Sequence, residues 1–188
     1  AEIIFGNADP ILLKDASNLK WMQLNSAGAG AYIAPGVFPV GVKLTNATGA
    51  YGQAVAEYMF AVMLMFMKKL HLYRDAQNKS VWTDMGDVTT PEGACVLIAG
   101  TGDIGTYFAR LVKGVGAYTI GIKRKAASAL DFFDEVAAID KLDEMLERAD
   151  VVASVLPSNA STEGIWNEAR FSRMKRSAFF LNAGRGSA

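Results

Sequence analysis

Three glycines, Gly100, Gly102 and Gly105, follow the apolar run of residues 95–99 and match the G-x-G-x-x-G spacing of dinucleotide-binding turns. The first glycine makes a tight turn, the second lets a pyrophosphate approach the backbone, and the third lets the next helix pack closely on the sheet. Free N–H groups and the positive end of the helix dipole would then attract the pyrophosphate. Because the motif lies between a buried-type strand and a helical segment, it predicts a nucleotide site; a purely structural turn is the alternative.

A basic triplet, Lys123-Arg124-Lys125, ends the next predicted strand, and Lys123 lies 18 residues past Gly105. In a unit that prefers NAD, an acidic residue about 20 positions after the motif binds the ribose 2′-OH. Lysine and arginine at this place would instead attract a 2′-phosphate. The triplet therefore predicts NADP as the preferred cofactor, with NAD possible; a solvated basic loop is the alternative.

The elements that must position these groups alternate between strand and helix. Strands are predicted at residues 1–5, 19–24, 42–46, 95–99, 118–122, 150–155 and 177–182. Helices are predicted at residues 53–77, after the glycine motif, and at residues 142–148 and 168–174. This order predicts an α/β fold, a doubly wound parallel sheet of the Rossmann type with right-handed crossovers.

The predicted helix of residues 53–77 is the longest element, and its apolar positions recur at three- and four-residue spacing. It is apolar on more than one face, which predicts burial on more than one side, at a domain or subunit interface. Its methionines are interpreted as core residues rather than metal or cofactor ligands. We expect a homodimer built largely on this helix.

Composition excludes several classes of protein. The 188 residues carry 19 basic and 19 acidic side chains, and this balance argues against nucleic acid as a partner. One cysteine excludes an intrachain disulfide framework and is compatible with a reducing compartment. The opening residues have no basic segment of a signal peptide, and the longest apolar stretch, residues 54–67, is too short for a membrane span. We therefore expect a cytoplasmic protein with no membrane partner.

Four separated blocks, in this order along the chain, resemble the D-isomer-specific 2-hydroxyacid dehydrogenase family. They are residues 19–28, residues 45–57, the glycine motif, and a set of segments within residues 149–186 that ends in Asn182-Ala183-Gly184-Arg185-Gly186. The resemblance implies two doubly wound domains with the substrate in the cleft between them. Residues 1–48 would be part of a flavodoxin-like substrate-binding domain, and residues 49–188 the NAD(P)-binding domain, including the interdomain helix of about residues 53–77.

The resemblance extends the predicted cofactor site beyond the motif and the basic triplet. It implies further contacts from two residues of the motif helix, from the loop after the strand of residues 150–155, and from the backbone after the strand of residues 177–182. The predicted cofactor-binding set is Gly100, Gly102, Asp103, Ile104, Gly105, Lys123, Arg124, Lys125, Leu156, Pro157, Thr162, Ala183 and Gly184. No metal site is expected.

The reaction that the resemblance implies is hydride exchange between the nicotinamide and a small 2-hydroxy or 2-oxo acid. The loop N–H groups of Ala27 and Gly28 would bind the substrate carboxylate. Arg185 would be the catalytic arginine that grips the carboxylate and polarises the carbonyl oxygen. An ordinary tight loop and a structural arginine are the alternatives. The family often has an aspartate two residues beyond the loop glycine, but this chain has Gly30.

The family's catalytic histidine and its supporting glutamate have no match in this chain. The one histidine, His71, lies on the predicted long helix and is interpreted as a packing residue. We expect the chain to lack both ends of the substrate domain, with the missing acid–base pair beyond Ala188.

Two other classes of function are weighed against the dehydrogenase. One is a non-enzymatic NAD(P)-binding module related to a dinucleotide-sensing corepressor; the basic triplet and the lack of an obvious partner-binding segment argue against it. The other is an S-adenosylmethionine methyltransferase, which usually has an acidic residue where this chain has Lys123.

Overall fold

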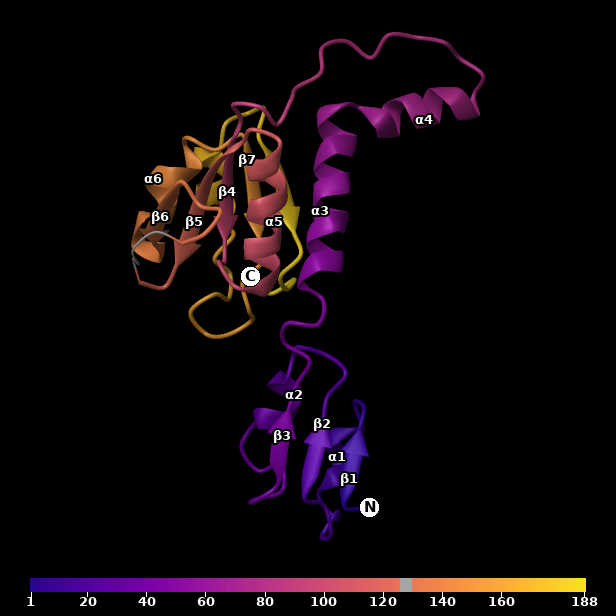
Figure 1. Cartoon of the computed structure of the whole chain (residues 1–188), viewed down its shortest axis with the longest axis vertical. Helices are drawn as coiled ribbons and strands as arrows, with labels where there is room; N and C mark the ends of the chain where they lie inside the picture. The colour runs from indigo at the N-terminus through magenta and orange to yellow at the C-terminus, as the bar shows by residue number, and fades with distance from the viewer. Residues whose placement is uncertain (126–129) are drawn as a thin grey trace. The chain divides into compact units, whose positions relative to one another are not determined.

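The computed structural model describes residues 1–125 and 130–188 (Figure 1). The chain forms two compact units, Ala1–Tyr51 and Gly52–Ala188, called unit 1 and unit 2 below. Within the described residues, none of the helices is long and apolar enough to cross a membrane.

Unit 1 is a small parallel sheet of three strands in the order β1-β2-β3. The strands are β1 (Ile3–Phe5), β2 (Trp21–Gln23) and β3 (Lys43–Thr45), and the connecting helices are α1 (Pro10–Leu13) and α2 (Gly30–Ile33). The helix α1 starts where Asp9 accepts a hydrogen bond from the N–H of Ile11 at 2.9 Å, and Pro10 suits its first position. Apolar side chains of both kinds of element make its core: Leu13, Leu19, Met22, Leu24 and Tyr32.

Unit 2 contains a five-stranded sheet in the order β6-β5-β4-β7-β8, in which all neighbouring strands are parallel. The strands are β4 (Cys95–Ala99), β5 (Tyr118–Lys123), β6 (Glu135–Ala138), β7 (Val151–Ser154) and β8 (Phe179–Asn182). The helices are α3 (Gly52–Met67), α4 (Leu70–Asn78), α5 (Asp103–Gly114), α6 (Leu142–Leu146) and α7 (Glu168–Arg173), with a 3₁₀ turn at Ile139–Lys141. The predicted doubly wound α/β fold is confirmed, and the edge strand β6 is an addition that the sequence pattern did not indicate.

The single long helix predicted for residues 53–77 is wrong, because α3 and α4 are separated by a break at Lys69, whose φ of 54° is left-handed. The carbonyl of Met67 accepts the N–H of Thr89 at 3.1 Å, so a segment that follows α4 takes part in ending α3. The side chain of Lys68 donates to the Thr89 carbonyl at 2.7 Å, and that of Lys69 to the Met85 carbonyl at 2.6 Å. The Met67 carbonyl is therefore paired with Thr89 rather than with an N–H of a continuing helix, and the two lysine side chains hold the later segment at this end of α3.

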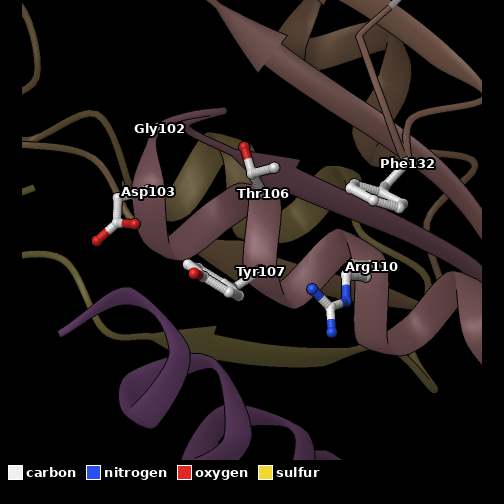
Figure 2. A pocket seen from close by; sticks show the side chains of 6 residues that line it. All are labelled: Gly102, Asp103, Thr106, Tyr107, Arg110 and Phe132. Atoms are coloured by element: carbon white, nitrogen blue, oxygen red, sulfur yellow. The ribbon is translucent and has the colours of Figure 1, made fainter. Parts of the chain in front are cut away.

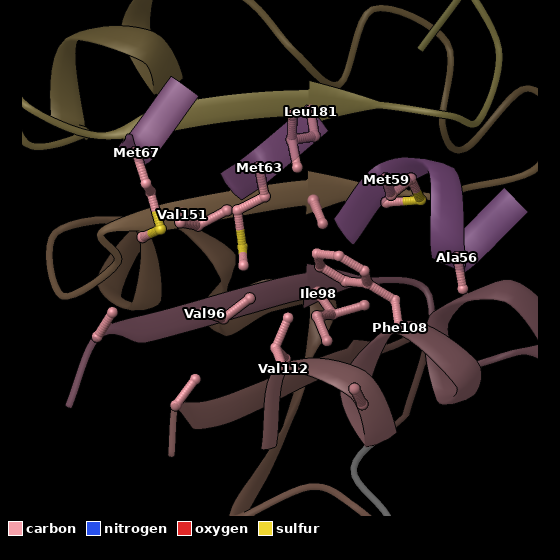
Figure 3. Packing of buried hydrophobic residues seen from close by; sticks show 14 of the residues in the cluster. Ala56, Met59, Met63, Met67, Val96, Ile98, Phe108, Val112, Val151 and Leu181 are labelled. Carbon is pink, nitrogen blue, oxygen red and sulfur yellow. The ribbon is translucent and has the colours of Figure 1, made fainter. Parts of the chain in front are cut away.

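Three of the four methionines of α3 are buried core residues, as predicted for this stripe, whereas Met65 is half-buried and lies outside the cluster. Met59, Met63 and Met67 lie on one stripe of the helix that faces α5 and the sheet (Figure 3). Phe108 of α5 packs into the same cluster and is fully buried. A second cluster contains residues of α6 together with Ile165 and Trp166. Apolar clusters on both faces account for the continuous apolar run of β4.

Candidate functional site

The turn after β4 needs glycine at two positions. Gly100 has a φ of +108°, and a Cβ there would lie 3.0 Å from the Val155 carbonyl oxygen. A Cβ on Gly105 would overlap the carbonyl oxygen of Gly100. Residues 100–105, called the glycine turn below, therefore have the close packing between strand and helix that the motif predicts.

The start of α5 leaves room for a ligand. A Cβ on Gly102 would meet no atom within 4 Å, and no side chain caps the helix. The first helical bond runs from the N–H of Thr106 to the Gly102 carbonyl at 2.9 Å. In the part of the chain that the structure describes, the N–H groups of residues 102–105 have no acceptor. Open space, free donors and a helix dipole fit the pyrophosphate of a dinucleotide.

The topology places this turn where open α/β sheets bind ligands. The central strand β4 pairs with β5 on one side and β7 on the other, and ligands bind at the carboxyl ends of strands where the order reverses. The loops after β7 and β8 meet at this edge: the N–H of Ala183 donates to the Ser154 carbonyl at 2.9 Å. A Cβ on Gly184 would lie 2.7 Å from the Leu156 carbonyl oxygen.

The basic triplet lies next to the glycine turn. The N–H of Gly100 donates to the Ile122 carbonyl at 3.0 Å, and Lys123 is the following residue and the last one of β5. Lys123 is half-buried, and Arg124 and Lys125 are exposed. Among the described residues, no carboxylate forms an ion pair with any of the three. Their charges are therefore available to an anionic ligand.

A pocket of about 390 Å³ lies along α5 beside the glycine turn (Figure 2). It is lined by Gly102, Asp103, Thr106, Tyr107, Arg110 and Phe132. Sequence reasoning missed the last four. The spacing of Gly102, Thr106 and Arg110 along one helix face is a signal that could have indicated two of them. Phe132 comes from the link before β6, and nothing in the sequence indicates that its ring would approach α5.

Three residues predicted to contact the cofactor are engaged in packing or loop structure. Thr162 is buried, and its hydroxyl donates to the Pro157 carbonyl at 2.6 Å, which orders the turn between them. Ile104 packs against the core under the glycine turn. The carboxylate of Asp103 lies against Gly52, at the start of α3.

Arg185 is exposed in the loop after β8. Its guanidinium donates to the Gly184 carbonyl at 2.9 Å. The side chain of Asn182 accepts the Gly184 N–H at 3.0 Å and donates to the Arg185 carbonyl at 3.3 Å. Asn182 thus sets the backbone from which Arg185 projects, a positioning role that the sequence analysis did not assign.

The loop of Ala27 and Gly28 follows β2 in unit 1. The side chain of Asn46 donates to the Ala27 carbonyl at 2.9 Å, and the Ser26 hydroxyl donates to the Gly28 carbonyl at 3.1 Å. The N–H groups of Ala27 and Gly28 have no acceptor among the described residues. The loop therefore has tethered carbonyls and free donors, which suits a carboxylate.

His71 lies near the start of α4, and its ring centroid is 4.8 Å from that of Phe66. Its Nδ1 atom is buried and lacks a hydrogen-bond partner within the described ranges. Over the same ranges, no three His, Cys, Asp or Glu side chains are grouped so that they could hold a metal ion.

At the other end of β5 from the basic triplet, Asp134 connects the start of this strand to the link before β6. Its carboxylate accepts the N–H of Thr119 at 2.9 Å, the Thr119 hydroxyl at 2.8 Å and the Lys113 ammonium at 2.6 Å. Burial acts to raise the pKa of Asp134, but these hydrogen bonds outweigh it, and the pKa lies below its ordinary value.

A five-stranded parallel sheet with a glycine turn at its switch point defines a Rossmann-type dinucleotide-binding domain. The model of the D-isomer specific 2-hydroxyacid dehydrogenase NAD binding domain matches residues 60–188. The chain therefore belongs to the D-isomer specific 2-hydroxyacid dehydrogenase family.

Relatives of known structure or name agree with this assignment. A crystal structure of a D-isomer specific 2-hydroxyacid dehydrogenase family protein from Aeromonas salmonicida is 33% identical, with a TM-score of 0.90 over 100% of this chain and 60% of that one. An NADPH-dependent glyoxylate/hydroxypyruvate reductase from Sinorhizobium meliloti, solved with NADP and sulfate, is 25% identical, with a TM-score of 0.82 over 99% of this chain and 61% of that one. A D-lactate dehydrogenase of Treponema pallidum is 28% identical over 92% of this chain and 52% of its own length.

The chain spans between 42% and 66% of the length of the curated relatives it matches, from a D-lactate dehydrogenase of Curvularia clavata to a Streptomyces coelicolor protein. The family match contradicts the methyltransferase alternative. Relatives named as dehydrogenases or reductases give no support to the non-enzymatic module.

Proposed function

We propose that this protein is an NADP(H)-preferring dehydrogenase that transfers a hydride between the cofactor and a small 2-hydroxy or 2-oxo acid. The observation that carries the proposal is the glycine turn with its free N–H groups, beside which β5 ends at Lys123 and is followed by Arg124 and Lys125. A protein that prefers NAD would need an acceptor for the ribose 2′-OH at this strand end, and three cations offer none.

The cofactor would lie across the carboxyl edge of the sheet. Its pyrophosphate would be bound by the N–H groups at the start of α5, and its 2′-phosphate by the basic triplet. The loops of Leu156-Pro157 and Ala183-Gly184 meet at the same edge, where they support the remainder of the cofactor.

Two separate groups would act on the substrate. The N–H groups of Ala27 and Gly28 bind its carboxylate, and their tethered carbonyls support this role. Arg185 polarises the 2-oxo group, because a guanidinium donates parallel hydrogen bonds to carbonyl and carboxylate oxygens. The nicotinamide supplies or accepts the hydride.

The proton that accompanies the hydride needs a donor on the substrate side. His71 of α4 is not proposed for this role, because its Nδ1 atom is buried and its ring packs beside that of Phe66 in α3. The histidine and glutamate expected for the family have no match among the 188 residues, so the proton donor is assigned to none of them.

We also propose a cytoplasmic homodimer built on α3, α4 and the segment after them. Large apolar side chains are exposed on these elements: Tyr58 is 71% exposed, Leu70 53% and Trp82 102%. Sedimentation at micromolar concentration tests the assembly, since a monomer would contradict it. The single free cysteine suits a reducing compartment.

The activity is tested by following oxidation of NADPH and NADH with glyoxylate, pyruvate, hydroxypyruvate and a branched 2-oxo acid. We expect turnover with at least one acid, a higher kcat/KM with NADPH, and a product of D configuration where the product is chiral. Dinucleotide binding without turnover of any 2-oxo acid would contradict the proposed reaction while leaving the cofactor site in place.

A further inference from the structure

The first residues of two helices meet in unit 2. Gly52 is buried at the start of α3, and Asp103 is the first residue of α5. A Cβ on Gly52 would overlap the carboxylate carbon and both carboxylate oxygens of Asp103. The carboxylate therefore fills the space that any side chain at position 52 would occupy.

The direction of this carboxylate matters for the glycine turn. Asp103 is one of the residues that line the pocket along α5, and Figure 2 shows its carboxylate projecting away from Thr106 and Phe132, which line the same pocket. Within the described residues, the Asp103 carboxylate forms neither a hydrogen bond nor an ion pair. It lies at the positive ends of two helix dipoles, those of the 16-residue α3 and the 12-residue α5, and these favour a negative charge there.

A carboxylate at this position works against a dinucleotide. Asp103 directly follows Gly102, where the backbone is open to a pyrophosphate. Two anions that share one helix terminus repel each other, and the repulsion grows as they approach. The side-chain rotamer that packs on Gly52 holds the carboxylate on the α3 side of the turn, and this rotamer is available because position 52 has no side chain.

We propose that Gly52 is a positioning residue for the dinucleotide site, because it provides the space that keeps the Asp103 carboxylate away from the pyrophosphate. The inference rests on the proposed function, since it requires that a dinucleotide binds at the glycine turn. It explains how an acidic residue is tolerated inside the motif. It also makes the first residue of α3 part of the cofactor site without any contact to the cofactor.

The test is a set of variants whose dissociation constants for NADH and NADPH are measured by fluorescence titration. Gly52→Ala displaces the carboxylate, and we expect it to weaken binding of both nucleotides about tenfold. The loss should shrink as ionic strength rises, because screening weakens the repulsion. Asp103→Asn alone should bind both nucleotides at least as tightly as the wild type.

The double variant Gly52→Ala/Asp103→Asn separates charge from shape. Asparagine is as large as aspartate but neutral, so we expect wild-type affinity if charge repulsion causes the loss. If the double variant binds as poorly as Gly52→Ala, the glycine has only a packing role and the inference is overturned. The thermal midpoint of each variant without nucleotide reports any loss of folding separately.

A second pair leaves α3 untouched, in case Gly52→Ala does not fold. Asp103→Glu carries its carboxylate beyond the space at Gly52, and we expect weaker binding of both nucleotides than in Asp103→Gln. Equal affinities in this pair would overturn the inference. A wild-type protein that binds neither nucleotide would overturn the proposed function itself. If the wild type binds the nucleotides and all the variants have the same dissociation constants as the wild type, only the role of Gly52 is overturned.

Discussion

The N–H of Gly100 donates to the carbonyl of Ile122 at 3.0 Å, and this bond places the end of β5 directly beside the glycine turn. Lys123, the next residue, therefore lies within the same edge of the sheet as the proposed pyrophosphate site. The bond joins the proposed pyrophosphate site to the basic triplet that we propose distinguishes NADP from NAD.

The first prediction concerns this distinction. Replacing Lys123 and Arg124 together by serine should weaken NADPH binding by about 10- to 100-fold per lost charged contact, with little change for NADH. The measurement is a titration of both nucleotides. Lys141→Ala is the matched control, because Lys141 is a lysine of the same unit that pairs with Glu144 instead. Equal losses for the two nucleotides would show that these cations do not contact a 2′-phosphate.

The second prediction compares two glycines of the turn. Gly102→Ala should keep the thermal midpoint of the wild type, because a Cβ there meets no atom within 4 Å. It should weaken the binding of both nucleotides, because the Cβ would fill the space proposed for the pyrophosphate. Gly105→Ala should lower stability by about 1–3 kcal/mol, the usual cost of overpacking, because its Cβ overlaps the Gly100 carbonyl. Gly114→Ala, in open space at the end of α5, is the control for both. A Gly102→Ala protein with unchanged affinity would rule out close approach of the ligand there.

The third prediction concerns Arg185. Arg185→Lys keeps the charge but loses the planar pair of donors, so kcat/KM for the 2-oxo acid should fall about 10- to 100-fold while NADPH affinity changes much less. Arg176→Lys is the matched control, because Arg176 is exposed just before β8 begins, whereas Arg185 follows its end. Near-normal turnover by Arg185→Lys would exclude the role proposed for Arg185.

The fourth prediction concerns the acid stability of unit 2. Hydrogen bonds from Lys113 and Thr119 hold the folded pKa of Asp134 below its ordinary 3.8. A lowered folded pKa contributes stability above the ordinary value, and this stability is lost as the pH falls below about 4. At neutral pH, Asp134→Asn should have a free energy of unfolding about 1–3 kcal/mol lower than the wild type. This difference should shrink as the pH falls below about 4, because the wild type then loses the contribution of the Asp134 carboxylate. Identical pH profiles of urea unfolding for the two proteins would contradict this.

The sequence pattern was most informative where local geometry decides the structure. The apolar run before Gly100, the glycine spacing and the helical spacing after it are local signals, and the strand, turn and helix lie where they predict. The break at Lys69 was missed because its cause is distant: Thr89 and Met85 bind the groups that end α3. Apolar periodicity continues across the break and cannot show it.

The candidate site divides in the same way. The place of the basic triplet at the end of β5, beside the glycine turn, could be predicted from the length of the strand and the spacing from the motif. The pocket beside α5 depends on Phe132, whose ring is brought there by the link before β6. The internal bonds of Thr162 and Asn182 depend on loop conformations that have no periodic signal. Asp103 fits the motif, yet its carboxylate fills the space beside Gly52, about 50 residues earlier in the chain, and no local pattern indicates this contact.

The break at Lys69 also has a consequence for how this part of the chain can vary. The bond between the Met67 carbonyl and the Thr89 N–H closes α4 and the following residues into a loop whose two ends meet at the end of α3. Loop closure costs only slightly more as a loop lengthens. Residues 70–84 lie between the contacts of Lys68 and Lys69 with Thr89 and Met85, so this stretch can change in length at small entropic cost while α3 still ends at the same place. Such a change would alter the proposed assembly surface without altering the nucleotide-binding sheet.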